Sequence, residues 1–238
     1  MQTKEKISII LPTFNEGENI PCLIEDIHNA LSGCDHEILV IDDNSADGTY
    51  EAARSLKAPY VKAILRTTDA SLGKSIRCGI ENASGDIFVI MDSDYNHQPR
   101  YIPFMLQSLS HYDCVLASRF LYGGRMDHPV RHYCSWIFNI FTRLMTGGGI
   151  TDSLYGYFAI KRKTMEECPY DLIFWGYGDY CIRLVYYLQK KNVPVLQIPA
   201  VNGKRRSGQG NSNLVKTFFQ YLFEVCKLTY KRFFDKRY

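Results

Sequence analysis

The sequence predicts an α/β fold in which a mostly parallel sheet is flanked by helices. Short β-branched runs such as 7–11 and 37–41 alternate with segments whose apolar residues recur at helical spacing. Strands and helices in this alternating order form βαβ units with right-handed crossovers, which build a parallel sheet. The 238 residues are 46% hydrophobic and 22% charged, so we expect a globular protein rather than a disordered or fibrous chain.

The alternation is regular up to about residue 100 and looser afterwards. Strands are expected at 7–11, 37–41, 61–65 and 87–91, and helices at 19–31, 49–56 and 74–83. Further helices are expected at 102–110, 133–145 and 179–191, further strands at 114–118 and 155–161, and Gly-rich stretches lie at 123–124 and 147–149. No internal repeat or linker interrupts this order, so residues 1–213 are interpreted as one domain with two subregions, about 1–120 and about 121–213.

Several classes of protein are excluded by the apolar segments and the cysteines. A bilayer span takes about 20 apolar residues. The longest uncharged candidate, 132–142, has about half that length and is followed by Arg143. The first residues pass directly into the strand at 7–11 without the apolar stretch of a secretion signal, so we expect a cytoplasmic protein. Eight cysteines are scattered singly, without zinc-site spacing, and are interpreted as reduced packing residues.

Positive charge is concentrated near the C-terminal end. From Lys204 onward there are nine Lys and Arg residues against two acidic ones, a net charge of +7, and because the whole chain carries +3 the preceding residues carry −4. Residues 214–238 predict a basic amphipathic helix rich in aromatic side chains, which suits an anionic membrane surface. The same pattern also suits a helix that packs on the core or docks against a partner's membrane helix.

Polar loops follow three of the predicted strands. Residues 12–16 follow the first strand, Asp42 and Asp43 follow the second, and the fourth ends in Asp92-Ser93-Asp94. The carboxyl ends of parallel strands meet at one edge of a sheet, where ligands bind, so we expect these loops to converge. Asp92 and Asp94 offer hard oxygen ligands that can share one Mg²⁺ or Mn²⁺. Taken alone, each carboxylate pair also suits a strand-ending turn or a helix N-cap.

Six segments resemble, in order and spacing, the family 2 glycosyltransferases of the GT-A fold. They are PTFNEGENI (12–20), VIDDNSADGT (40–49), LGKSIRCGIENASGD (72–86), MDSDYNHQP (91–99), ASRF (117–120) and RHYCSWIFN (131–139). The resemblance covers about residues 7–212 and is strongest to the branch of dolichyl-phosphate mannosyltransferases and other polyprenyl-phosphate glycosyltransferases. It implies a GT-A fold with a nucleotide-sugar half at about 1–120, an acceptor half at about 121–213, and a metal-dependent, inverting transfer of a hexose.

The resemblance also implies roles for individual residues. The nucleotide sugar would be held by Pro12, Thr13, Phe14, Asn15, Glu16, Asp42, Asp43, Lys74, Asp92 and Ser93, with Asp42 or Asp43 accepting from a base N–H. Asp92 and Asp94 would bind the cation on the donor diphosphate, and Asn96 stands where close relatives carry a further ligand. Arg119 and Arg131 match arginines that face phosphate. Arg205 and Arg206 lie in a Gly-rich basic loop that suits the diphosphate.

The acceptor decides between two functions. A lipid phosphate is already an anion and needs cationic guidance, whereas a sugar hydroxyl needs a general base. The four arginines just named favour a polyprenyl (dolichyl or undecaprenyl) phosphate, with Asp94 and the arginines stabilising the departing diphosphate. The alternative is a saccharide acceptor in cell-surface glycan or glycolipid synthesis with Asp179 as the base, although Asp179 also suits the first turn of a helix.

The partners follow from these charges. We expect a nucleotide sugar linked to UDP or GDP, a polyprenyl phosphate, and a membrane surface or membrane protein at 214–238, on the cytoplasmic face. Nucleic acid is not expected, because the acidic loops would repel its phosphates.

Overall fold

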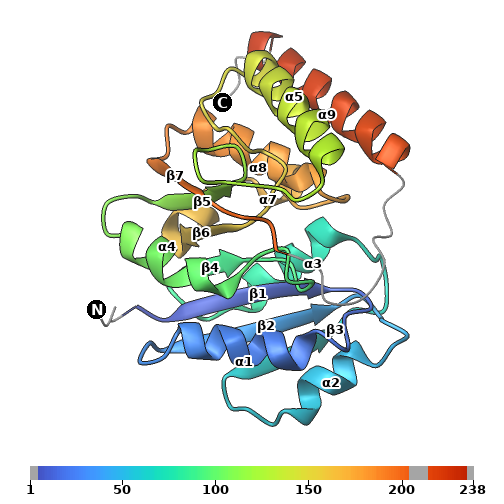
Figure 1. Ribbon diagram of the computed structural model, residues 1–238, viewed down its shortest axis with the longest axis vertical. Helices are drawn as coiled ribbons and strands as arrows, with labels where there is room; N and C mark the ends of the chain where they lie inside the picture. Colours follow the sequence, from blue (N-terminus) through green and yellow to red (C-terminus); the bar gives the residue numbers. More distant parts are fainter. Residues whose placement is uncertain (1–4, 204–213, 235–238) are drawn as a thin grey trace.

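A seven-stranded sheet forms the centre of the computed structural model, which describes residues 5–203 and 214–234 (Figure 1). The strands are β1 (Ile7–Thr13), β2 (His36–Asp42), β3 (Val61–Leu65), β4 (Ile87–Ile90), β5 (Cys114–Ser118), β6 (Phe158–Lys161) and β7 (Val195–Pro199). Their order in the sheet is β3-β2-β1-β4-β6-β5-β7. Of these seven, β6 pairs antiparallel with β4 and β5, and the remaining pairs are parallel. The predicted mostly parallel α/β fold is confirmed.

Helices cover both faces of the sheet. They are α1 (Ile20–Ala30), α2 (Thr49–Ser55), α3 (Leu72–Asn82), α4 (Ile102–Ser108), α5 (Pro129–Thr146), α6 (Arg162–Glu166), α7 (Tyr170–Ile173), α8 (Asp179–Lys190) and α9 (Leu214–Phe234), with a 3-10 turn at Pro99–Tyr101. Successive residues of β1 point to opposite faces: Ile9 packs with residues of α1, α2 and α4, and Ile10 packs with residues of α3 and α8. The core therefore has two apolar layers, one on each side of the sheet.

Two predicted boundaries shift for local reasons. α5 begins at Pro129 rather than at residue 133, because Pro129 fits the first turn and Nδ1 of His128 accepts from the Arg131 amide at 3.3 Å. β6 begins at Phe158 rather than at residue 155, because Gly156 has a φ of +73°, outside the strand region. The sequence analysis missed β7, α6 and α7, whose four or five residues are too short to carry a period.

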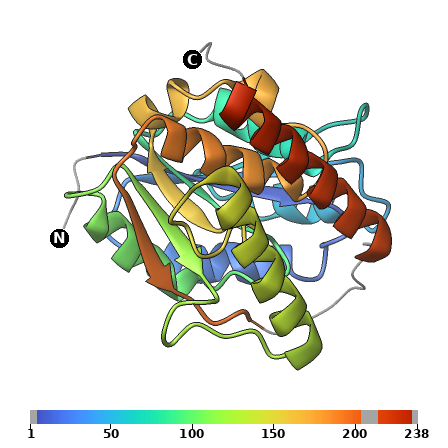
Figure 2. The ribbon, with the colours of Figure 1, turned by 90° about the horizontal axis from the view of Figure 1, so that it is seen from above.

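α5 and α9 lie side by side at one end of the molecule, and α9 also packs on α8 (Figures 1 and 2). The Phe138 ring of α5 lies 5.7 Å from Phe218 and 6.3 Å from Tyr221, measured between ring centroids. Val225 and Leu228 bury one side of α9 in the core. The C-terminal helix expected from the sequence thus packs on the core along one face. Among the helices of 5–203 and 214–234, none has both the length and the apolar character to cross a bilayer.

Candidate active site

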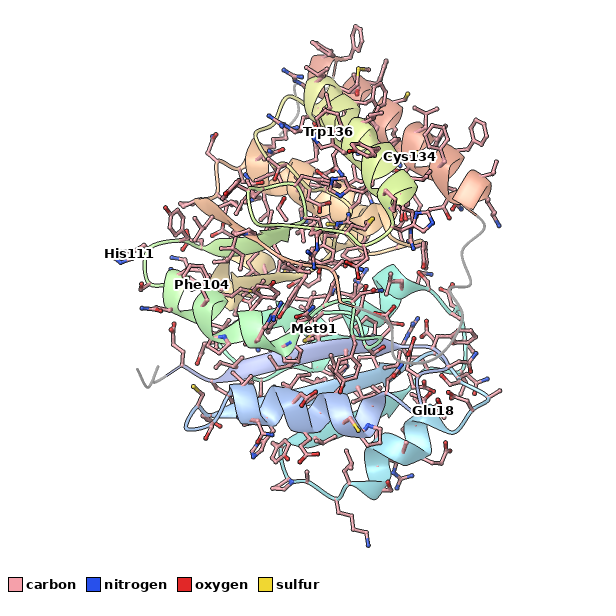
Figure 3. All side chains as sticks on the ribbon, in the orientation of Figure 1. Glu18, Met91, Phe104, His111, Cys134 and Trp136 are labelled. Atoms are coloured by element: carbon pink, nitrogen blue, oxygen red, sulfur yellow. The ribbon has the colours of Figure 1, made fainter. Side chains whose placement is uncertain are left out.

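The loops after β1, β2 and β4 meet at one edge of the sheet, as the sequence predicts. β1 pairs in parallel with both β2 and β4, so the three strands end together. Two hydrogen bonds join the loops: the Asp43 amide donates to the Thr13 carbonyl, and Ser93 Oγ donates to the Pro12 carbonyl, each at 3.1 Å. Figure 3 labels Met91, which follows β4, near the centre of the molecule. The three loops therefore form one continuous surface.

The loop after β1 is held by the turn after β2. Asn15 has a φ of +58°, a conformation that Asn tolerates, and its amide donates to Ser45 Oγ at 2.8 Å. The Glu16 amide donates to Thr49 Oγ1 at 2.9 Å, and the Glu16 side chain is buried. Phe14 is 51% exposed. The apolar side chain that this predicted nucleotide-binding loop offers to a ligand is therefore Phe14.

Asp42 and Asp43 are buried within the turn. Both oxygens of Asp42 accept from Ser45, from its amide at 2.9 Å and its hydroxyl at 2.5 Å. Asp43 forms an ion pair with Arg66 and accepts from the Ser71 amide at 2.8 Å. These contacts fix the shape of the turn, and a contact between either carboxylate and a base stays a prediction.

Arg66 is a site residue that the sequence analysis missed. Its Nη1 contacts the Asp43 carboxylate and donates to Ser75 Oγ at 2.6 Å. Arg66 directly follows β3, whose carboxyl end lies at the same edge as those of β1 and β2. Its position after a strand end at this edge is therefore the sequence signal that predicts it.

A pocket of about 450 Å³ lies beside the loops. Its lining includes Arg66 and Lys74, and Lys74 forms an ion pair with Asp69. In the described part of the chain, neither Asp92 nor Asp94 lines this pocket. Lys74 therefore lies near Arg66, at a pocket whose described lining contains no residue of the loop after β4.

Asp92, Asp94 and Asn96 share the loop that follows β4. The Asp92 side chain is 40% exposed, whereas Asp94 is buried. Asp94 accepts from the Asn96 amide at 3.0 Å and from Asn96 Nδ2 at 2.6 Å, and Asn96 Oδ1 accepts from Asn202 Nδ2 at 2.9 Å. The donor set of two carboxylates fits Mg²⁺ or Mn²⁺, whose remaining positions phosphate oxygens and water commonly fill. Asn96 is bound to Asp94 and Asn202 on its two sides.

Aromatic rings pack beneath this loop. The buried His97 ring lies parallel to the Tyr157 ring and edge-on to the Tyr155 ring. Burial lowers the pKa of His97 to about 4, so the ring is neutral.

Arg119 contacts Asp152 instead of facing an open surface. Its Nε donates to Asp152 Oδ2 at 2.7 Å and its Nη2 donates to Oδ1 at 2.9 Å. The guanidinium also lies 4.7 Å from the Tyr155 ring centroid. Arg119 as a whole is 7% exposed. Burial opposes the charged form, yet the Asp152 carboxylate raises the pKa of Arg119, which stays protonated. Arg119, expected to face phosphate, holds Asp152 in this structure.

Arg131 and Asn139 lie on α5 at different depths. Arg131 is exposed in the first turn. Asn139 is buried, its Oδ1 accepts from the Ser153 amide at 2.7 Å, and its Nδ2 lies 3.5 Å from Asp152 Oδ1. Asn139 therefore ties α5 to the Asp152 loop, and Arg131 stays open to solvent.

Asp179 begins α8 and forms an ion pair with Arg183. Asp179 Oδ2 lies 2.6 Å from Arg183 Nη1, and Arg183 is 1% exposed. Nε of Arg183 donates to the Ile173 carbonyl at 2.9 Å, and its guanidinium lies 3.8 Å from the Trp175 ring centroid. Glu224 of α9 also approaches Arg183 Nη1, at 3.5 Å. Asp179 thus occupies the first helical turn, the other role that its sequence position suits.

Arg205 and Arg206 lie outside the described residues. The described chain before them passes the loop that follows β4, because the Gly203 amide donates to the Asn96 carbonyl at 2.9 Å. In sequence, the two arginines follow Gly203 by two and three positions.

A family model and two curated relatives all point to one family of glycosyltransferases. The model of glycosyl transferase family 2 matches residues 8–168. Dolichol-phosphate mannosyltransferase of Pyrococcus furiosus is 32% identical over 94% of this chain, which spans 63% of that protein. Undecaprenyl-phosphate mannosyltransferase of Micrococcus luteus is 32% identical over 86% of this chain and 86% of its own length.

A solved structure shares the fold. Glucosyl-3-phosphoglycerate synthase from Mycobacterium tuberculosis aligns with a TM-score of 0.75 at 20% identity, over 95% of this chain and 80% of that one. At this identity the likeness supports the fold alone, and it agrees with the GT-A fold that the motifs predict.

Proposed function

The chain belongs to glycosyl transferase family 2, and on that basis we propose that it transfers a hexose from a nucleotide sugar to a polyprenyl phosphate, with inversion at the anomeric carbon. The observation that carries the proposal is the junction of three loops at the carboxyl edge of the sheet, with Asp92 and Asp94 on one of them. The mannosyltransferase relatives are named for dolichol phosphate and undecaprenyl phosphate, which supports a lipid-phosphate acceptor.

Asp92 and Asp94 would hold a Mg²⁺ or Mn²⁺ ion on the donor diphosphate. When bound, such a cation offsets the negative charge that develops on the departing diphosphate. Asp94 is fixed by Asn96, and the Asp92 side chain is 40% exposed. The mycobacterial structure contains Mn²⁺ with uridine diphosphate, which supports a cation and a nucleotide in this family of folds. The nucleoside would bind to the loops that carry Phe14 and Asp43.

The charges around the site suit an acceptor that is already an anion. A phosphate oxygen can attack the anomeric carbon without losing a proton, so the chain needs to orient it rather than to supply a base. Arg131 is exposed at the start of α5, and the basic segment with Arg205 and Arg206 follows Gly203 in sequence. These cations would guide the lipid phosphate toward the donor.

α5 and α9 would rest on an anionic membrane surface. Both helices expose apolar side chains, which we call the apolar face. They are Val130, Tyr133, Trp136, Ile137 and Leu144 of α5, and Val215, Phe219, Phe223, Tyr230 and Phe233 of α9. Trp136 is labelled on α5 beside α9 in Figure 3. The two helices contain six Lys and Arg residues, and their one acidic residue, Glu224, is buried. Aromatic and basic side chains without exposed carboxylates suit the headgroup region of an anionic bilayer. This supports a peripheral position on the cytoplasmic face.

Replacing both Phe219 and Phe223 with serine should weaken binding to anionic vesicles at least about tenfold, because two exposed aromatic rings no longer enter the interface. Cosedimentation with vesicles of an anionic phospholipid measures this, and added salt should weaken wild-type binding as well. Tyr122→Ser is the matched control, since Tyr122 is fully exposed but lies outside both helices. Equal binding of the double variant and the wild type would contradict membrane binding through the apolar face of α5 and α9.

The alternative acceptor, a saccharide hydroxyl, would require Asp179 as base. The buried ion pair with Arg183 disfavours it, because the carboxylate is already bound to a cation inside the protein. Asp179→Asn should therefore keep transfer to lipid phosphate within about tenfold, whereas loss of a general base costs about 10²–10⁴-fold. Initial rates of Asp179→Asn and the wild type across pH test this, and the free energy of unfolding of each shows whether the variant is folded. A loss of 10²-fold or more in a folded variant would favour the saccharide acceptor.

Incubation with labelled sugar nucleotides tests the proposed function as a whole. The full chain is mixed with Mg²⁺ or Mn²⁺, a panel of UDP-, GDP- and CDP-sugars, and a polyprenyl phosphate. Label should enter the organic phase with one donor, which would also identify the sugar. Donor that is consumed only when a saccharide is added, with the label staying in the aqueous phase, would contradict the lipid acceptor.

A further inference from the structure

His97 is fixed in one orientation beneath Asp92. Its ring is 1% exposed, lies parallel to the Tyr157 ring with centroids 4.8 Å apart, and lies edge-on to the Tyr155 ring at 4.5 Å. The hydroxyls of these two tyrosines donate to the carbonyls of the residues before and after His97, at 3.0 and 2.9 Å. A ring packed on two sides, with both neighbouring peptide groups anchored, is held in place.

Hydrogen bonding decides which nitrogen of His97 carries the proton. Nδ1 accepts from the Asp92 amide at 2.7 Å, so the proton of the neutral ring lies on Nε2. Nε2 is buried and makes no hydrogen bond of normal geometry within residues 5–203 and 214–234, although the Tyr155 backbone carbonyl lies near the ring. Nε2 lies 3.5 Å from Asp92 Oδ2. Because a buried N–H without a well-aligned acceptor is unfavourable, this donor is available to the neighbouring carboxylate.

We propose that His97 is a positioning residue for the cation site, which donates Nε2–H to Asp92 Oδ2 and so fixes the orientation of that carboxylate. This inference rests on the proposed function, in which Asp92 binds a cation on the donor diphosphate. The same ring would then fix Asp92 twice, at its amide through Nδ1 and at its carboxylate through Nε2. Removing such an outer hydrogen bond typically weakens metal binding about 10- to 100-fold.

The test uses Mn²⁺ binding to the full chain, followed by electron paramagnetic resonance, with uridine or guanosine diphosphate present. In His97→Asn, the amide oxygen can replace Nδ1 as acceptor for the Asp92 amide, but no donor stands where Nε2 was. Mn²⁺ affinity should fall at least about tenfold. In an Asp92→Asn background, the same substitution should change it by less than about twofold, because His97 acts through that carboxylate.

Tyr157→Phe is the matched control. It keeps the ring stacked on His97 and the Nε2 donor present, and it removes one of the two peptide anchors, so Mn²⁺ affinity should fall by less than in His97→Asn. A His97→Asn variant that loses stability but binds Mn²⁺ like the wild type would overturn the proposal, as would equal losses in both Asp92 backgrounds. If the wild-type chain itself binds no Mn²⁺ with either nucleotide, the cation site fails and this role with it, an outcome separable from failure of His97 alone.

A measurement on the wild-type chain keeps the proposal testable if His97→Asn does not fold. Imidazole ¹H–¹⁵N spectra should show a proton on Nε2 of His97, and this proton should shift downfield when Mg²⁺ and the nucleoside diphosphate are added. A proton on Nδ1, or an Nε2 proton unaffected by both ligands, would overturn the assignment.

Discussion

Asp94→Ala should reduce sugar transfer on the order of 10³-fold while the chain stays folded. The substitution removes one of the two carboxylates proposed to hold the cation, so charge on the departing diphosphate is left uncompensated. Asp94 is buried and accepts two hydrogen bonds from Asn96, so we also expect a stability loss of about 1–2 kcal/mol. Initial rates with saturating donor and acceptor, together with denaturant unfolding, measure both effects.

Asp113→Ala is the matched control for this experiment. Asp113 forms a partly exposed ion pair with Lys161 and precedes β5, at the amino edge of the sheet and away from the loops. Its loss should leave turnover within about twofold of the wild type. If Asp94→Ala keeps near-full turnover in the presence of Mg²⁺ or Mn²⁺, the assignment of Asp94 to the site is wrong.

The parts of the fold with long apolar periods could be predicted from sequence. β1 is a β-branched apolar run and α1 carries helical spacing, and both are predicted within one or two residues of their ends. β7 could not be found, because its five residues lie at the edge of the sheet and end in Pro199. α5 was placed four residues late, since its start depends on a cap by His128, which helix periodicity does not report.

The site divides in the same way. The aspartates at strand ends could be placed because the carboxyl edge of a parallel sheet is fixed by topology, which brings the loops that carry Asp43 and Asp94 together. Which partner each charge takes could not be predicted, because partners come from distant segments. Arg119 was expected at phosphate, and Asp152, thirty-three positions later, is its partner. Asp179 and Arg183 are instead four positions apart within α8, and it is the burial of their ion pair that depends on how α7, α8 and α9 pack.

Arg183 connects three segments by buried charges. Its Nη1 lies 2.6 Å from Asp179 and 3.5 Å from Glu224 of α9, and its Nη2 contacts the Trp175 carbonyl. Glu224 Oε1 has no hydrogen-bond partner among the residues that the structure describes, and Lys227, partly exposed, lies 3.8 Å from Oε2. The negative charges of two buried carboxylates, Asp179 and Glu224, are therefore compensated chiefly by the Arg183 guanidinium. A buried charge left without its partner is strongly unfavourable, whereas the net stability of an intact pair is modest.

Arg183→Met should consequently lower the free energy of unfolding by about 3–5 kcal/mol, because Asp179 and Glu224 stay buried without their cation. For a chain of this size that corresponds to a melting temperature roughly 6–20 °C lower. Denaturant unfolding measures the change. Adding Glu224→Gln to Arg183→Met should recover part of the lost stability, because the amide carries no charge that needs a cation. Glu224→Gln alone should destabilise the wild type, because Arg183 then loses one of its carboxylate partners.

Arg77→Met separates this effect from the loss of any ion-paired arginine. Arg77 binds Glu81 and Asp171, but its side chain is 34% exposed, so its removal should cost no more than about 1 kcal/mol. If Arg183→Met costs as little as Arg77→Met, the buried carboxylates are compensated by other groups. In that case α9 is held on α8 by its apolar residues Val225 and Leu228 rather than by charge, and Glu224→Gln should be neutral in both backgrounds.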